Sequence, residues 1–234
     1  MKEVYEFLKI GGVLMIPIAI GSVIALAIFI ERLWALQKSK IAPDGLAQKI
    51  IDFAEKREFS KARDIALSSN TPLGRILLTG IDAKDEDRAN IKIRFEEAGR
   101  QEMARMNRFI EAMGTTASVE PLMGLLGTVT GMIKVFQKVV GSSSSGAVDP
   151  AQLASGIWQA LMTTAAGLSV AIVAFVGYRY LQSVSSSRAI AMEGAAIELL
   201  DAIIPSASFA DEKKSEKSSS GKNSSDRSPK EEKK

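Results

Sequence analysis

The sequence predicts an all-α integral membrane protein with three transmembrane helices, long helices that extend into the cytoplasm, and a small helical cytoplasmic domain. Charged residues make up 24% of the 234-residue chain, yet three stretches hold almost none of them. Each stretch is about 20 residues or longer, the length of helix that crosses the hydrocarbon core of a bilayer. Between the stretches, apolar residues recur at the spacing of amphipathic helices.

Composition excludes several classes of catalytic protein. The chain contains no cysteine and no histidine, which excludes disulfides, Cys/His zinc sites, thiol nucleophiles and Ser-His-Asp catalysis. Its formal net charge of +3 does not indicate a nucleic-acid partner. The sequence has no nucleotide-binding loop and no metal-ligand motif. We therefore expect a protein that is not an enzyme and that needs no cofactor or metal.

The first predicted span covers residues 11–30 and follows a short N-terminal segment, residues 1–10. Its sequence, GGVLMIPIAIGSVIALAIFI, holds no charge. The alternative is a cleaved signal peptide, because Ala25 and Ala27 resemble a cleavage site. Two features favour the span: the side chains of the N-terminal segment have no net positive charge, and the apolar run continues past Ala27 to Ile30.

The second and third predicted spans, residues 112–140 and 157–181, differ from the first in composition. They are rich in Gly, Ala, Ser and Thr rather than in Leu and Ile. Small residues let helix backbones approach closely in a membrane, and a lipid-facing helix has no need of them. We therefore expect both spans to be buried against other helices and to be joined by a short loop at residues 141–156.

The distribution of basic residues predicts the orientation of the chain. The segment between the first two spans, residues 31–111, holds 16 Lys and Arg, whereas residues 141–155 hold none. Cytoplasmic segments carry the excess of positive charge. We therefore expect residues 31–111 and the C-terminus in the cytoplasm, and the N-terminus and the short loop in the periplasm. Lys134 and Lys138, at the outer end of the second span, count against this orientation without outweighing the rest.

The segment 31–111 is predicted to form the small helical domain. Asp44 is predicted to cap a helix that follows it, since its side chain can bond to free backbone N–H groups. Thr71 and Pro72 have the pattern of another helix N-terminus, with proline at the first helical position. From about Glu86 the helical pattern continues without a break into the second span.

The chain after the third span is predicted to form a cytoplasmic helix at residues 182–210 and a disordered tail at residues 211–234. The tail contains no aromatic and no β-branched residue, so it cannot bury enough apolar surface to fold. Its six acidic residues dilute the attraction of its lysines to anionic lipids.

Polar residues in the second span need an explanation, because polar groups inside a membrane are costly. Glu120, Gly124 and Thr128 fall at i, i+4 and i+8, which puts a carboxylate and a hydroxyl on one helix face. Gly127 and Gly131 lie beside them as a G-x-x-x-G packing motif. This face is therefore a candidate for either a polar path or a close helix contact.

The third span carries a similar polar stripe. Gln159 and Thr163 share one face, and Gly156, Ala160 and Thr164 form a row of small residues next to it. Two polar stripes on helices joined by a short loop favour a shared polar path or a helix-binding groove. The residues expected to pack the helices are Gly124, Gly127, Gly131, Gly156, Ala160 and Gly167.

Simpler explanations stay open for the individual polar residues. A threonine hydroxyl in a membrane helix can bond to a carbonyl of its own helix and need no further role. Glu120 lies near the cytoplasmic end of its span, so an interfacial position is an equal alternative to a role in a pore.

The runs PLMGLLGTVTGMIKVF (121–136) and QLASGIWQALMTTAAGLSVAI (152–172) resemble the ExbB/TolQ/MotA family of inner-membrane proton-channel subunits. The family pattern is roughly P-L-x-G-L-L-G-T-V-x-G in the second span and G-I-x-(E/Q)-A-L-x-x-T-A-x-G-L in the third. Both motifs occur in the right order around a short loop. The three-span topology is closer to ExbB than to MotA, which has four spans, and TolQ stays an alternative.

The resemblance implies a homo-oligomer in the bacterial inner membrane, a pentamer around a central pore. The pore would hold two copies of a single-span partner, ExbD-like or TolR-like, whose aspartate carries the proton. The resemblance also implies that Thr128 and Thr164 occupy the positions that line the family's proton route. Many members carry Glu where this chain has Gln159, and an amide cannot relay a proton. A frequent proline of the third span is replaced by Val173, which predicts a straighter helix.

The implied function is a proton-channel and motor subunit that converts proton-motive force into mechanical work on a TonB-type transducer for outer-membrane import. The alternative is a TolQ-like subunit of the Tol envelope-maintenance system, which shares the chemistry and differs in its partner. The acidic role falls to the partner's aspartate, with Glu120 as a minor local candidate. The candidate pathway residues are Thr128, Thr164, Gln159, Thr163 and Glu120.

Overall fold

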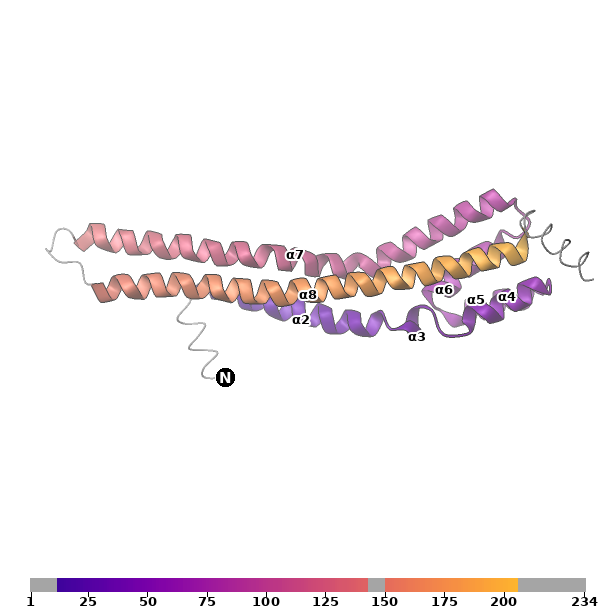
Figure 1. Ribbon diagram of the computed structural model, residues 1–234, viewed down its shortest axis with the longest axis horizontal. Helices are drawn as coiled ribbons and strands as arrows, with labels where there is room; N and C mark the ends of the chain where they lie inside the picture. Colours follow the sequence, from indigo (N-terminus) through magenta and orange to yellow (C-terminus); the bar gives the residue numbers. More distant parts are fainter. Residues whose placement is uncertain (1–11, 143–149, 206–234) are drawn as a thin grey trace, which may run out of the picture. The chain divides into compact units, whose positions relative to one another are not determined.

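The computed structural model describes residues 12–142 and 150–205. The helices are α2 (Met15–Ala35), α3 (Lys38–Ile41), α4 (Leu46–Glu55), α5 (Phe59–Ser69), α6 (Pro72–Asp82), α7 (Arg88–Ser142) and α8 (Pro150–Ile203) (Figure 1). The described residues contain no strand, which confirms the predicted all-α fold. The segments predicted at residues 1–10 and 211–234 lie outside the described residues.

Three of these helices, α2, α7 and α8, are long and apolar enough to cross a membrane. This finding confirms the predicted class, an all-α membrane protein. The bounds differ from the prediction around the loop, because α7 continues to Ser142 and α8 begins at Pro150 rather than at residue 157. Proline suits the first turn of a helix, where its missing N–H is not needed. Residues 150–156, predicted as loop, are therefore helical.

The chain divides into two compact units. Within the described residues, the membrane unit covers residues 12–41, 102–142 and 150–189, and the helical unit covers residues 42–101 and 190–205. Helices α7 and α8 each contribute one part to each unit. The candidate pathway residues all lie in the membrane unit.

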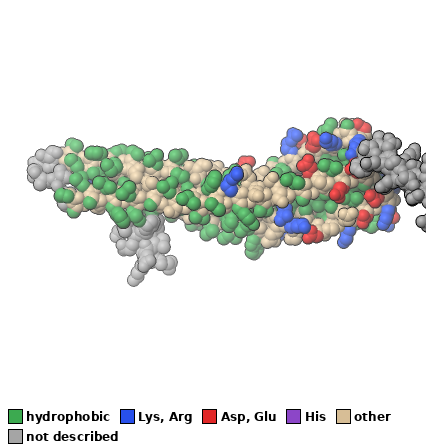
Figure 2. All heavy atoms as spheres, viewed as in Figure 1, with side chains coloured by type: hydrophobic (Ala, Val, Ile, Leu, Met, Phe, Trp, Pro, Cys, Tyr) green, Lys and Arg blue, Asp and Glu red, His purple; other side chains and the backbone are tan. Residues whose placement is uncertain are grey.

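In the membrane unit, α2 packs against α7 and α8 through small side chains. Ala25 of α2, Ala117 of α7 and Ala174 of α8 form one buried cluster. The opposite face of α2 exposes large aliphatic side chains, among them Val23 and Leu26. Apolar side chains cover most of this unit on the face shown in Figure 2, whereas Lys, Arg, Asp and Glu gather over the helical unit. This surface suits a hydrocarbon environment.

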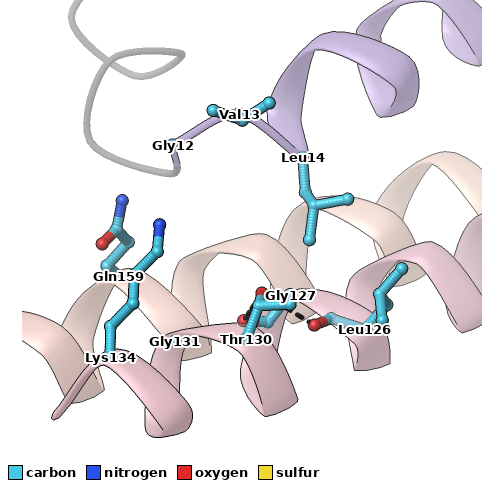
Figure 3. Close-up of a pocket in the computed structure, with 9 residues that line it drawn as sticks. All are labelled: Gly12, Val13, Leu14, Leu126, Gly127, Thr130, Gly131, Lys134 and Gln159. Atoms are coloured by element: carbon cyan, nitrogen blue, oxygen red, sulfur yellow. Dashed lines mark hydrogen bonds between the residues drawn. The ribbon is translucent and has the colours of Figure 1, made fainter. Parts of the chain in front are cut away.

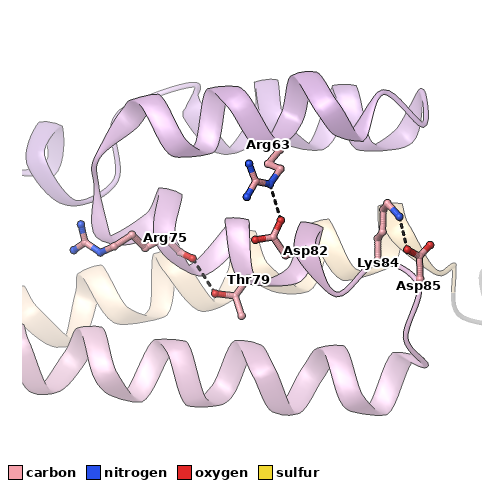
Figure 4. Close-up of polar contacts among 6 residues, drawn as sticks. All are labelled: Arg63, Arg75, Thr79, Asp82, Lys84 and Asp85. Atoms are coloured by element: carbon pink, nitrogen blue, oxygen red, sulfur yellow. Dashed lines mark hydrogen bonds and ion pairs between the residues drawn. The ribbon is translucent and has the colours of Figure 1, made fainter.

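In the helical unit, α4, α5 and α6 pack on one another. The buried side chains of these helices are Ile50, Ile51, Ala54, Ala62, Ala66, Leu73, Ile76, Leu77 and Ile81. On the surface, Arg63 of α5 forms an ion pair of 2.8 Å with Asp82 of α6, and Lys84 pairs with Asp85 (Figure 4). Apolar burial therefore supplies the core, and the ion pairs lie at its edge.

The structure tests both predicted helix caps in this unit. Thr71 confirms its prediction, because its hydroxyl oxygen accepts a hydrogen bond of 3.1 Å from the Gly74 N–H, with Pro72 at the first helical position. The predicted cap at Asp44 is wrong. Gly45 occupies the N-cap of α4 with a φ of +77°, a left-handed conformation that glycine adopts at little cost.

The C-terminal end of α8 is held by two arginines of the helical unit. Arg57 donates a hydrogen bond of 3.1 Å to the carbonyl oxygen of Ile203. Arg88 donates to the carbonyl oxygen of Ile204 and forms an ion pair with Asp201. Cations at a helix C-terminus satisfy its free carbonyls and complement its dipole. These contacts hold the last turn of α8, which ends at Ile203, and residues 206–210 of the predicted cytoplasmic helix lie outside the described residues.

Candidate functional site

Three glycines of α7 bring its backbone close to α8. A Cβ atom added at Gly124 would lie 3.1 Å from the Cα of Thr164, and one at Gly131 would lie 2.8 Å from the Cβ of Ala160. A Cβ added at Gly127 would collide with the Thr163 side chain. These positions therefore admit no side chain without a shift of one helix. We call this contact the α7–α8 seam.

The small residues of α8 continue the seam on the other helix. Gly156 faces the side chain of Val135, and a Cβ atom there would overlap it. Gly167 lies against the backbone of α7, where an added Cβ would be 2.6 Å from the carbonyl oxygen of Glu120. The structure thus places all six residues expected to pack the helices along one line of contact.

The threonine hydroxyls of the seam donate to backbone carbonyls. Thr164 donates across the seam to the Gly124 oxygen at 2.9 Å. Thr163, which is 2% exposed, donates to Ala160 in its own helix at 2.7 Å. Thr128 likewise donates within α7, at 2.7 Å. Each hydroxyl oxygen keeps its acceptor capacity for water or an acidic group, since only its proton is engaged.

A cavity of about 230 Å³ lies between the start of α2 and the seam. Gly127, Thr130 and Gly131 line it on the α7 side, and Gln159 and Lys134 point toward Gly12 and Val13 (Figure 3). The cavity therefore carries one cation and two neutral polar groups beside the seam, near the start of α2.

Two lining residues of this cavity are absent from the sequence-based site. The sequence pattern uses Lys134 only for the orientation of the chain and assigns no role to Thr130. Both follow Gly127 on the same face, at i+7 and i+3. This spacing is the feature of the sequence that could have identified Thr130 and Lys134. That their face borders a cavity becomes clear only from the position of the start of α2 in the structure.

Glu120 lies apart from the seam hydroxyls. Glu120 is 4% exposed, and its carboxyl group faces Gly21 of α2. One carboxyl oxygen, Oε2, has no hydrogen-bond partner among the described residues. Helical spacing groups Glu120 with Thr128, but eight residues separate them by roughly 12 Å along the axis. The structure therefore does not bring these two candidate residues together.

Metal binding has no support in the described part of the chain. Residues 12–142 and 150–205 contain no group of three or more His, Cys, Asp or Glu side chains that could hold a metal ion. The polar groups that line the seam and its cavity are hydroxyls, the Gln159 amide and backbone carbonyls, with Lys134 as the one cation of the cavity. The neutral groups among these can solvate a proton carrier or water, because they donate and accept hydrogen bonds without a fixed charge.

Comparison with known proteins places these helices in a family. The model of the MotA/TolQ/ExbB proton channel family matches residues 68–194. A protein named ExbB-like 1 from Synechocystis sp. is 36% identical over 198 residues, which are 83% of this chain and 77% of that protein. The biopolymer transport protein exbB1 of Vibrio cholerae is 26% identical over 189 residues, which are 77% of this chain and 80% of the Vibrio protein. The biopolymer transport protein ExbB of Pseudomonas putida is 29% identical over 201 residues, which are 80% of this chain and 58% of the Pseudomonas protein.

The family match covers the parts of the molecule described above. Residues 68–194 include most of α7 and α8, with every glycine and threonine of the seam. The similarity to the Synechocystis protein extends over most of both chains. The chain therefore belongs to the MotA/TolQ/ExbB proton channel family.

Proposed function

We propose that this chain is the proton-channel subunit of a bacterial inner-membrane complex that performs mechanical work on a TonB-type transducer for outer-membrane import. The observation that carries the proposal is the α7–α8 seam. Two long membrane helices are joined there by glycines, and hydroxyl oxygens line the contact. The names of the relatives, which are ExbB proteins, support the TonB-type role.

The proposed complex is a pentamer of this chain around two single-span, ExbD-like partners, each with an aspartate in the membrane. Such a carboxylate is costly when ionised in hydrocarbon. The oxygens of Thr128 and Thr164 and the water between them would solvate it during transfer. A proton that crosses about 100 mV releases roughly 2.3 kcal/mol, which is the energy available for work.

The orientation is part of the same proposal. The 16 Lys and Arg of residues 31–111 favour a cytoplasmic helical unit, with the start of α2 and the loop after α7 on the periplasmic side. Protons would then enter near the cavity at Lys134 and Gln159 and leave on the cytoplasmic side. The start of α2 borders that cavity at Gly12 and Val13.

The composition of the complex tests the proposal. The full chain, purified in detergent alone and after co-expression with the single-span protein encoded beside it, would be weighed by native mass spectrometry. A ring of five that captures two copies of an aspartate-bearing partner supports the proposal. A monomer or dimer that ignores this partner contradicts it. A partner of the TolR type would instead assign the chain to the Tol system.

Proton flux into vesicles containing the complex tests the residues. The double variant Thr128→Val and Thr164→Val is expected to lower the flux at least tenfold, because valine keeps the shape and removes both hydroxyls. Thr115→Val is the control, since the exposed Thr115 lies on the same helix away from the seam and bonds to the Glu111 carbonyl. Unchanged flux in the double variant contradicts a role for these threonines.

A further inference from the structure

Glu120 is the one acidic residue of the described membrane core. Residues 15–30 of α2, 112–142 of α7 and 150–178 of α8 contain no other Asp or Glu. Polar groups in this environment are costly and commonly functional. The family pattern allows Glu at the position of Gln159, which is an amide here, so this chain holds its only described core acid at Glu120 instead.

The carboxyl group of Glu120 is enclosed by two other helices. On α2, Gly21 leaves the space that the group occupies, because a Cβ atom there would overlap the Glu120 Oε1. The methyl group of Thr116 borders the same space. On α8, Gly167 packs against the Glu120 backbone. The carboxyl group is therefore buried beside Gly21 and the Thr116 methyl group, and we call this site the cage.

Along the described parts of α2, α7 and α8, every other charged residue lies far from this cage in the sequence. On α2, the nearest charges along the chain are Glu31 and Arg32, which pair with each other and lie about 15 Å from Gly21 along the axis. On α8 the nearest is Arg179, twelve residues from Gly167. On α7 they are Glu111 and Lys134, nine and fourteen residues from Glu120. No cation in the described core is thus placed to balance an ionised Glu120.

We propose that Glu120 is a proton-binding site within the membrane, formed between α2 and the α7–α8 pair. The carboxylate takes up one proton to give the neutral acid and releases it again, and Oε2, which lacks a partner, is the atom available to hold it. Water or the partner's acid supplies the proton. As a step of transport, this inference rests on the proposed function, whereas proton binding itself belongs to this chain alone.

Chemical modification of the purified full chain in lipid vesicles tests the site. Dicyclohexylcarbodiimide is apolar enough to enter the bilayer and reacts with protonated carboxyl groups. A carboxyl oxygen bonds to the central carbon of the reagent, and the acid proton moves to one of its nitrogens. We expect an adduct on the peptide that contains Glu120, with a yield that falls at least fivefold as the pH is raised. Glu111→Gln, an exposed position of α7, should keep the adduct, and Glu120→Gln should lose it.

Infrared spectroscopy keeps the test decisive where the reagent cannot reach the cage. Between about pH 6 and 9 the exposed carboxylates stay ionised. A carboxylic-acid band that changes within this range, is lost in Glu120→Gln and survives in Glu111→Gln supports the site. The absence of both the adduct and the band overturns it.

The two proposals fail separately. If Glu120 is not modified and the infrared band is absent, but the complex still conducts protons, the proton-binding site at Glu120 is wrong and the proposed channel function stands. If Glu120 titrates, but the complex with its partner conducts no protons, the proton-binding site stands and the proposed channel function is wrong.

Discussion

The hydroxyl group of Thr164 donates a hydrogen bond of 2.9 Å to the carbonyl oxygen of Gly124, forty residues earlier in the chain. This bond joins the two long helices at a point where their backbones lie close together, since a Cβ atom on Gly124 would lie 3.1 Å from the Thr164 Cα. Thr164 therefore has a packing role besides the role in the proton route that the family resemblance implies.

The Thr164 contact allows these two roles to be separated. Thr164→Val removes the hydroxyl and leaves the Gly124 carbonyl without this donor, which is expected to cost about 0.5 to 1.5 kcal/mol of stability. Thr164→Ser keeps the hydroxyl and should recover both the melting temperature in detergent and the proton flux. If Thr164→Ser recovers stability but not flux, the methyl group rather than the hydroxyl serves transport.

The close contact between Gly127 and Thr163 predicts that even the small side chain of alanine is not tolerated at position 127. In Gly127→Ala the new Cβ would lie 2.6 Å from the Cβ of Thr163, so one helix must move. Overpacking of this kind costs about 1 to 3 kcal/mol. Gly99→Ala on the same helix is the matched control, because nothing lies within 4 Å of a Cβ atom there. Thermal unfolding should show a lower melting temperature for Gly127→Ala and an equal or higher one for Gly99→Ala.

An equal effect of the two glycine substitutions would mean that helix propensity, not contact, limits these positions. Alanine is favoured over glycine in a helix by up to about 1 kcal/mol. Only a steric limit at the seam reverses that sign at Gly127 and not at Gly99.

The lysine beside Gln159 predicts how the chain responds to an acid at this position. Lys134 lines the same cavity and forms no ion pair among the described residues. Gln159→Glu should therefore gain a counter-ion and keep its melting temperature. The double variant Gln159→Glu and Lys134→Met should melt lower than either single variant, because the new carboxylate in the membrane-spanning part of the helix then has no counter-ion. Additive effects would show that the two side chains do not interact.

The sequence predicts those features of the fold that depend on local pattern. The span lengths, the small residues of the seam and the Thr71 cap each follow from a few neighbouring residues. Asp44 was assigned as a cap by the same reasoning, but the helix begins after Gly45 because that glycine adopts a left-handed φ. A residue's type fixes its preference for a cap, whereas the path of the chain decides which residue occupies it.

The surroundings of Glu120 could not be predicted from its own helix. The i, i+4 spacing aligns Glu120 with Gly124 and Thr128, and it says nothing about what faces that stripe. The structure places Gly21, which lies 99 residues earlier in the chain, opposite the carboxyl group. The register and rotation of α2 decide this contact, and these depend on packing between helices rather than on the pattern within one.

The end of α8 provides a prediction for the helical unit. Arg88 donates to the Ile204 carbonyl and pairs with Asp201. Arg94, close by on α7, pairs with Glu86, and this hydrogen bond raises the pKa of Arg94 above its ordinary value. Arg88→Gln should weaken the last turn of α8 by about 1 kcal/mol, since it removes a charged partner of the terminal carbonyl.

Amide hydrogen exchange distinguishes these two arginines in the intact chain. Exchange at residues 199–204 should become about fivefold faster in Arg88→Gln, because a loss of about 1 kcal/mol changes a local opening equilibrium by that factor. Arg94→Gln should leave the same amides unchanged, as Arg94 bonds to Glu86 at the surface rather than to a carbonyl of α8. Equal protection in both variants would show that apolar burial of Leu199 and Ile203 alone holds the helix end.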